Sequence, residues 1–358
     1  MNATDIANNR IFNQKIEVKT IKSAKELVSY MGAMQAQDFS MAKWAVGVRL
    51  LNSTEKQIET AYNNGEILRT HIMRPTWHFV SSDDIYWILQ LTAPRIKAFM
   101  KSSDLKLGLT ENVLNMCYRL MEQKLINDSC VDRDELKQLF SAENIKTDDN
   151  ALSHIMMNAE LDGLICSGPL RNNKLTYALL EERVPEKKYL SKEESLAELS
   201  RRYFTSHGPA TLQDFVWWSG LSITEARKAM DLIKSDFIIE TIDSKRYCFR
   251  NSDTTFHGDA SVLLLPAFDE FLIAYTDRSA SLLLVDNRKT ISDNGIFRPI
   301  IVINGQVAGI WRRTTKKDKA LVELFFFQPQ SVEIKAKAEN EVLKYEQFIN
   351  KRVELEFK

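Results

Sequence analysis

A helix followed by a two-stranded hairpin recurs three times in this sequence, and this recurrence constrains the fold more than any other feature. In each copy an amphipathic helix leads into two short apolar runs separated by turn-forming residues. A pair of predicted helices precedes each copy, and three helices followed by a hairpin is the element order of a winged helix-turn-helix. The helix pairs and the copies that follow them occupy residues 23–49 and 54–80, 112–141 and 150–180, and 193–219 and 222–250.

The three copies are not similar letter by letter, so the alternative is three unrelated helix–hairpin units in one α+β chain. In a winged helix-turn-helix the third helix is the one offered to a DNA groove. The pattern therefore raises nucleic-acid binding as a hypothesis that other features of the sequence have to support.

The composition changes after Asn251. Residues 262–265 form an apolar run typical of a buried strand, Asn304-Gly305 is a strong type I′ hairpin signal, and an amphipathic helix over 331–351 precedes a last alternating strand. We therefore predict an α+β, mainly helical protein with three tandem winged helix-turn-helix units and a C-terminal α+β module. The predicted domains are residues 1–105, 106–188, 189–255 and 256–358.

The charge balance limits the kinds of partner. The 358 residues contain 48 Lys and Arg and 48 Asp and Glu, so no global field attracts a polyanion, and any DNA-binding surface requires a local segregation of charge. The four cysteines are far apart and share no ligand-like spacing, which is typical of buried thiols in a reducing compartment. The N-terminal residues lack the pattern of an export signal, and no apolar run approaches 18 residues. We expect a cytoplasmic protein without a membrane span.

Polar residues interrupt an apolar helical hairpin at Gln35-Ala36-Gln37-Asp38. A capping box at Ser23 starts the first helix, and a second helix is predicted to begin near Ser40. If the first helix ends near Met34, the amides of Gln35 and Gln37 lie on one side of an extended segment and can converge on one point. The alternative is that these side chains only hydrate and cap a helix junction.

The first hairpin is unusually polar, with His71, Arg74 and His78. A metal site would need further ligands, and none has a matching spacing, so we expect neither a metal nor a cofactor. Contact between Arg74 and a phosphate, or hydrogen bonding at the hairpin tip, is one interpretation, and plain surface histidines are the other.

Two more groups of basic residues lie in predicted hairpins. Arg171 and Lys174 lie in the turn of the second hairpin, and Arg312, Arg313 and Lys316 belong to the densest basic run of the chain. Such runs are usually solvated hairpin tips, but they also suit contacts with a phosphate backbone.

Acidic residues interrupt the apolar segment that follows residue 265. Burying an unpaired carboxylate is costly, so we expect Asp269 and its neighbour Glu270 to find hydrogen-bond donors. Asp277 lies next to Arg278, and a structural ion pair between them is a simpler interpretation than a catalytic couple. No phosphate-binding or dinucleotide-binding loop and no nucleophile elbow occurs in the chain.

Five segments of the chain resemble the winged-helix DNA-binding domain family of AlkZ-like DNA glycosylases, which are azinomycin-resistance and YcaQ-related proteins. The resemblance spans nearly the whole chain in order. It implies three tandem winged helices folded into a C shape, with a concave channel for duplex DNA. The family's catalytic signature is a glutamine, an apolar residue, and then a glutamine or aspartate, and Gln35-Ala36-Gln37 matches the glutamine branch. The matching segments are MGAMQAQDFSMAKWAVGVRL, RTHIMRPTWHFV, FTSHGPATLQDFVWWSGL, LLPAFDEFLIAYTDRS and FRPIIVINGQVAGIWR.

The implied chemistry has to suit amides. Glutamine does not titrate near neutral pH, so it is not a strong general base, but it can orient a water molecule and its dipole can stabilise a developing oxocarbenium ion. An N7-alkylated purine is already cationic and leaves without protonation. Asp38 is an accessory candidate to which the signature gives no role. The family also implies little extrusion of the base, so we expect no deep base-flipping pocket.

The resemblance therefore implies a DNA glycosylase that excises N-alkylated purines, bulky or interstrand-crosslinked ones included, from duplex DNA as a monomer. The alternative is a non-catalytic winged-helix DNA-binding or regulatory protein, and a third hypothesis is a protein-interaction scaffold. Release of free base separates the first two, whereas DNA binding does not. For either DNA-binding hypothesis we expect the basic residues to gather on one concave face: Arg74, Arg171, Lys174, Arg312, Arg313 and Lys316, with His71 as a further contact.

Overall fold

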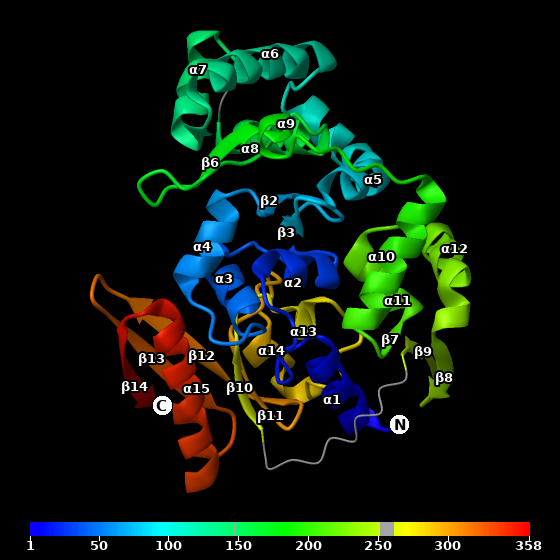
Figure 1. The fold of residues 1–358 in the computed structure, drawn as a ribbon, viewed down its shortest axis with the longest axis vertical. Coiled ribbons are helices and arrows are strands. Elements are labelled where there is room, and N and C mark those ends of the chain that lie inside the picture. The colour runs from blue at the N-terminus through cyan, green and yellow to red at the C-terminus, as the bar shows by residue number, and fades with distance from the viewer. Residues whose placement is uncertain (146–147, 251–260) are drawn as a thin grey trace.

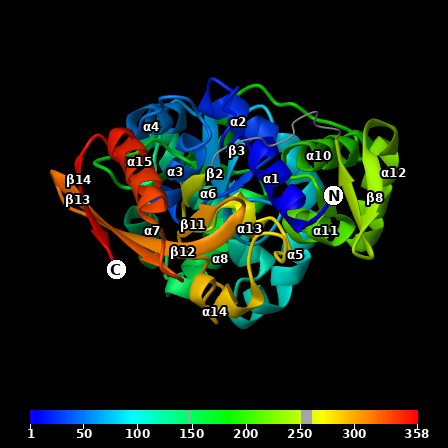
Figure 2. The ribbon, with the colours of Figure 1, turned by 90° about the horizontal axis from the view of Figure 1, so that it is seen from below.

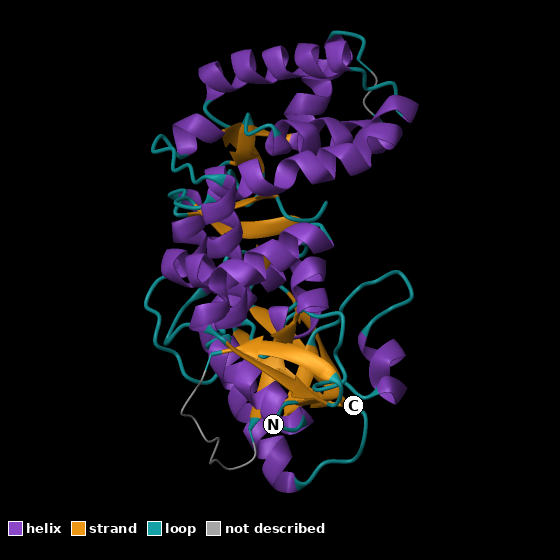
Figure 3. Cartoon of the chain, turned by 90° about the vertical axis from the view of Figure 1, so that its right-hand side faces the viewer, coloured by secondary structure: helices purple, strands orange, loops and turns teal. Residues whose placement is uncertain are grey.

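The structure is a computed structural model that describes residues 1–145, 148–250 and 261–358. The molecule is elongated, and its strands lie at three levels between layers of helices (Figure 3). The mixed α+β class is confirmed. The boundary expected between residues 255 and 256 lies outside the described residues, and the other domain boundaries stay predictions.

Three blocks of the chain share one order of elements: helix, two-residue strand, helix, helix, strand, strand. In each block the strands form a three-stranded antiparallel sheet with the last strand in the middle. The first block comprises α2 (Ala24–Met31), β1 (Met34–Gln35), α3 (Phe39–Gly47), α4 (Glu55–Asn63), β2 (Ile67–His71) and β3 (Trp77–Ser81). The second comprises α6 (Glu111–Asp128), β4 (Val131–Asp132), α7 (Arg133–Ala142), α8 (Asp149–Leu161), β5 (Ile165–Ser167) and β6 (Thr176–Leu179). The third comprises α10 (Lys192–Ser206), β7 (Ala210–Thr211), α11 (Leu212–Ser219), α12 (Ile223–Ile233), β8 (Ile238–Ile242) and β9 (Lys245–Phe249).

The three two-residue strands β1, β4 and β7 were not expected from the sequence. Each connects the first and second helices of its block and pairs with the block's last strand. Two residues are too few to show the alternation that marks a strand, so only the partner strand defines them. Each of these strands adds a third strand to the hairpin of its block.

Local signals fix where many of the helices begin. Thr54 and Gln57 form a complete capping box at the start of α4, and Ser222 and Glu225 form another at the start of α12. Each cap satisfies backbone N–H groups that have no partner within the helix, which stabilises a helix by about 1 kcal/mol.

Further helices connect the blocks. α1 (Ala3–Asn13) precedes the first block, α5 (Ile85–Lys106) runs for 22 residues to the second, and α9 (Leu180–Arg183) follows the second sheet. In Figure 1 the second block lies at the top, the third at the right, and the C-terminal elements lie below the first block. None of the helices in the described part of the chain is long and apolar enough to cross a membrane.

The C-terminal module is built on one five-stranded sheet, in the order β10-β11-β12-β13-β14. β13 and β14 are parallel, and the helix α15 connects them along one face of the sheet (Figure 2). Asn304 and Gly305 have φ values of 49° and 80°, as the predicted type I′ turn requires. The elements are β10 (Val262–Leu265), α13 (Glu270–Ile273), α14 (Asn287–Thr290), β11 (Ile300–Ile303), β12 (Gln306–Thr315), β13 (Lys319–Phe326), α15 (Val332–Ile349) and β14 (Arg352–Phe357).

The first block shares its hydrophobic core with the C-terminal module. The Trp44 ring lies 5.2 Å from that of Tyr345 in α15, and its indole N–H donates to the Leu264 carbonyl at 2.9 Å. On the opposite face of the first sheet, Leu68 and Val80 join the core of the third block, whereas the second block has a core of its own. The sheet that contains Gln35 is therefore buried from both sides.

Candidate active site

The segment with Gln35 leaves helical geometry earlier than expected. α2 ends at Met31, not near Met34, because Gly32 follows it with a φ of 80°, a conformation that glycine adopts readily. Gln35 then lies in β1, directly opposite His78 of β3. The strand places Gln35 at the edge of a sheet that neighbouring blocks cover.

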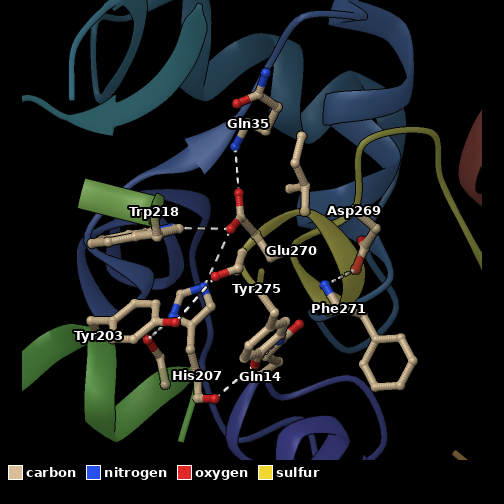
Figure 4. Close-up of polar contacts among 12 residues, drawn as sticks. Gln14, Gln35, Tyr203, His207, Trp218, Asp269, Glu270, Phe271 and Tyr275 are labelled. Carbon is tan, nitrogen blue, oxygen red and sulfur yellow. Dashed lines mark hydrogen bonds and ion pairs between the residues drawn. The ribbon is translucent and has the colours of Figure 1, made fainter. Parts of the chain in front are cut away.

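The Gln35 side chain is 5% exposed and held at both ends. Its Oε1 accepts hydrogen bonds from Arg74 Nη2 at 3.2 Å and from the Thr76 hydroxyl at 3.4 Å. Its backbone N–H donates to Oε1 of Glu270 at 2.6 Å (Figure 4). The amide is therefore pre-oriented by the turn of the first hairpin, and the peptide is oriented by the C-terminal module.

Glu270 is the first residue of α13 and is fully buried. Besides the Gln35 N–H, its carboxylate accepts from the Trp218 indole N–H at 3.1 Å and lies 3.3 Å from His207 Nε2. Burial alone would raise the pKa of Glu270, but the hydrogen bonds and the nearby Arg74 charge hold this pKa below its ordinary value. Burial lowers the pKa of His207, so the imidazole is neutral and the carboxylate carries the charge of the pair.

Gln37 and Asp38 lie in a more open environment than Gln35, and both are exposed. The backbone around them is fixed by Arg69, which donates to the Ala36 carbonyl at 2.8 Å and to the Gln37 carbonyl at 3.3 Å. Asp38 caps α3, since its Oδ1 accepts from the Met41 N–H at 3.0 Å. The expected convergence of the two amides stays a prediction.

The interpretation of His71 and His78 as plain surface histidines is wrong, because both are buried. His71 Nδ1 pairs with Glu160 of α8, and its ring lies 4.5 Å from that of Trp77. Covered in this way, His71 is not available as a DNA contact. His78 Nδ1 bonds the Thr76 carbonyl at 2.9 Å, and burial lowers the pKa of this imidazole to about 3.

Arg74 connects Gln35 to an aromatic residue that sequence reasoning missed. Its guanidinium, which donates to Gln35 Oε1, also lies 5.4 Å from the ring centroid of Trp217 in α11. Trp217 is 42% exposed, and its indole N–H is fixed to the Ile273 carbonyl at 2.8 Å. The pair Trp217-Trp218 in the sequence was the available signal: one indole supports Glu270 inside the protein and the other faces solvent.

The remaining basic residues lie in the second block and in the C-terminal sheet. Arg171 pairs with Glu135, and Lys174 lies 3.9 Å from Asp132. Arg312 and Arg313 are neighbours on β12 and therefore point to opposite faces of the sheet, and the expected gathering of the basic residues on one concave face stays a prediction.

Arg312 and Arg313 have different contacts on the two faces of the sheet. Arg313 donates to the Tyr345 hydroxyl at 2.8 Å on the side of α15, whereas Arg312 is exposed above the Phe325 ring on the other side. Lys316 is exposed close to the turn between β12 and β13.

Asp269 and Asp277 are structural. Asp269 forms a two-pronged ion pair with the buried Arg49, with both distances 2.8 Å, as expected for a buried acid. Asp277 pairs with Lys245 at 2.5 Å, so the predicted ion pair with Arg278 is wrong. The adjacent arginine donates to the Leu272 carbonyl instead. Within the described ranges, no group of three or more His, Cys, Asp or Glu residues could hold a metal ion.

Comparisons with known proteins relate this chain to one class of protein, the DNA glycosylases. The structure is similar over 99% of both chains to the solved Streptomyces sahachiroi DNA glycosylase AlkZ, with a TM-score of 0.79 and 20% identity. In sequence, the chain is 23% identical over 344 residues to an interstrand DNA cross-link repair glycosylase of Streptomyces sahachiroi, covering 91% of each.

The family model described as DNA glycosylase AlkZ-like matches residues 28–348. The chain therefore belongs to the AlkZ-like DNA glycosylase family. This confirms the resemblance found in the sequence and the expected enzyme class.

Proposed function

We propose that this protein is a monofunctional glycosylase that removes N-alkylated purines, bulky or interstrand-crosslinked ones included, from duplex DNA. The observation that carries the proposal is the pre-orientation of Gln35, a residue of the family's catalytic signature, by Arg74, Thr76 and Glu270. The related glycosylase whose name refers to interstrand cross-link repair supports the bulky end of the substrate range.

The two glutamines have different roles in this mechanism. Because Oε1 of Gln35 already accepts from Arg74 and Thr76, the Nε2–H groups are the ones left to face the substrate or its water. Gln37 is exposed, and its amide oxygen accepts a hydrogen bond from the attacking water, whose proton passes to solvent after the new C–O bond has formed. The Gln37 oxygen is the negative end of its amide dipole, so beside the sugar it also stabilises the oxocarbenium-like transition state without a titrating base. The cationic N7-alkylpurine leaves without help from an acid.

The scaffold suits duplex DNA if the three blocks are winged helix-turn-helix units arranged in a C shape around a channel. Their shared order of elements and shared sheet order support this assignment, in which α4, α8 and α12 are the third helices. Arg312 and Lys316 on the exposed hairpin, with Lys174 and the half-buried Arg74, are candidates for phosphate contacts. Arg171 and Arg313 have intramolecular partners and are weaker candidates.

The direct test is the release of free base from duplexes that carry N7-methylguanine or a crosslinked purine. We expect the wild-type protein to release base and leave an abasic site, with no strand cleavage of its own. Binding of both duplexes without release from either would contradict the proposal and favour a non-catalytic DNA-binding protein. Release from the crosslinked duplex alone would restrict the substrate to bulky lesions.

A further inference from the structure

We propose that Glu270 is a positioning residue whose buried negative charge stabilises the positive sugar that forms beside Gln35. The proposal rests on the proposed function, because the positive sugar arises only in glycosidic bond cleavage. It assigns a role to a carboxylate that contacts Gln35 from within the protein and is 1% exposed.

Hydrogen bonds hold the Glu270 carboxylate against the segment that contains Gln35. Oε1 accepts the Gln35 N–H, and Oε2 accepts the Trp218 indole N–H and faces His207 (Figure 4). These groups come from the first block and the third block, whereas Glu270 belongs to the C-terminal module. A carboxylate supplied with donors on both oxygens stays ionised in the interior and cannot move away from the Gln35 peptide.

The site needs such a charge. Gln35 and Gln37 are neutral, and Asp38 is exposed and occupied as the cap of α3. Arg74 is bonded to Gln35 Oε1 and Arg69 to the Gln37 carbonyl, and both guanidinium groups would oppose a developing positive charge. Glu270 offsets part of this positive charge. A buried charge interacts with a developing positive charge more strongly than the same charge would in water, because the interior screens it less.

Glu160 offers a matched control. It is also a 1% exposed carboxylate, and it also accepts a backbone N–H, that of His71 at 3.2 Å, beside the imidazole of the same residue. Substitution of either glutamate by glutamine removes one buried charge and keeps the shape. Glu270 contacts Gln35 and Glu160 contacts His71 instead, so the charge of Glu270 should act more strongly on the sugar.

The test compares binding of two abasic-site analogues in one duplex at fixed salt and neutral pH. One analogue has a protonated pyrrolidine in place of the sugar, which mimics the oxocarbenium ion, and the other has a neutral tetrahydrofuran. We expect wild-type protein and Glu160→Gln to prefer the cationic duplex at least tenfold. In Glu270→Gln the preference should fall about tenfold or more, while the affinity for the tetrahydrofuran duplex changes less than threefold.

Three results would overturn the proposal: a wild-type preference near one, an unchanged preference in Glu270→Gln, or equal losses in both variants. If Glu270→Gln does not fold, as checked by thermal unfolding, Glu270→Asp replaces it. This variant keeps the charge and should keep at least half of the logarithmic preference, whereas loss of all preference would refute the role of charge. Because this readout is equilibrium binding, a failure to release base would contradict the proposed function separately.

Discussion

The backbone N–H of Gln35 lies 2.6 Å from Oε1 of Glu270, although 235 residues separate them along the chain. This contact joins the edge strand of the first sheet to the first helix of the C-terminal module. The candidate active site is therefore complete only when the N-terminal and C-terminal parts of the chain are packed together, which the shared core of the two parts ensures.

Trp217 should affect the excision of bulky lesions more than that of small ones. The guanidinium of Arg74 contacts both the exposed Trp217 ring and the side chain of Gln35. Stacking of an aromatic ring on a base contributes about 1–3 kcal/mol. We expect Trp217→Ala to lower single-turnover excision of a bulky aromatic N7 adduct about 5- to 100-fold. Excision of N7-methylguanine should stay within about threefold, since a methyl group offers no aromatic surface for the ring to stack on.

The control for this prediction is Tyr189→Ala, which removes a 60% exposed ring from the segment before α10 and should change neither rate. Equal losses on both lesions with Trp217→Ala would show that the indole acts on the fold of the site and not on the adduct.

Reversal of the Arg312 charge should weaken DNA binding without regard to sequence. Phosphate contacts carry no sequence information. The logarithm of the DNA-binding constant falls linearly with the logarithm of the salt concentration, and each lost phosphate contact makes this dependence less steep by about 0.9. We expect Arg312→Glu to weaken binding to unrelated duplexes equally and to lower this slope by about one.

Lys188→Glu, an exposed charge before α10, serves as the control. A salt slope that stays the same in both variants would remove Arg312 from the DNA-binding surface.

Arg313→Glu should behave differently from Arg312→Glu. It breaks the bond to Tyr345, so its main effect should be a lower unfolding temperature.

Acid should destabilise the fold through buried histidines. His78 is neutral in the folded protein because burial lowers its pKa from 6.5 to about 3, and the pKa of His207 is lowered by the same cause. Between these pH values the unfolded chain binds the proton and the folded chain does not, so the free energy of unfolding falls as the pH falls from 6.5 towards 3. His78 contributes a slope of about 1.4 kcal/mol per pH unit between these values, and His207 acts in the same direction.

The measurement is denaturant unfolding at pH 7, 6, 5 and 4 with the wild type and His78→Gln. In His78→Gln the dependence of the unfolding free energy on pH should be less steep by about 1.4 kcal/mol per pH unit. This variant should also be less stable than the wild type at pH 7. An unchanged slope would mean that His78 is protonated in the folded protein or is not the group that titrates.

Local signals made much of the fold predictable. The capping box at Thr54, the helix α12 after Ser222 and the Asn304-Gly305 turn are each specified by residues within a few positions of one another. Long-range contacts were not predictable in this way. The strand β1 exists only through its partner β3, and His71 is buried only because Glu160 and α8 cover it.

The candidate site was predictable only in part for the same reason. The signature Gln35-Ala36-Gln37 is a local pattern, so the resemblance to a family could find it. Glu270 follows Asp269 in an apolar segment, and nothing nearby in the sequence distinguishes the acid that pairs with Arg49 from the acid that contacts Gln35. That assignment depends on how three parts of the chain pack together.

The central claim is that Gln35 and Gln37 orient the water that attacks the sugar, and single-turnover excision of N7-methylguanine beside a DNA-binding titration tests it most directly. Removal of one oriented hydrogen-bonding group costs about 100- to 1000-fold in rate, while amides contribute little to the electrostatic binding of DNA. We expect Gln35→Ala and Gln37→Ala to lower the excision rate by that amount with unchanged affinity, and Gln123→Ala, an exposed glutamine of α6, to change neither. Wild-type excision that persists at the same rate in both signature variants would contradict the mechanism.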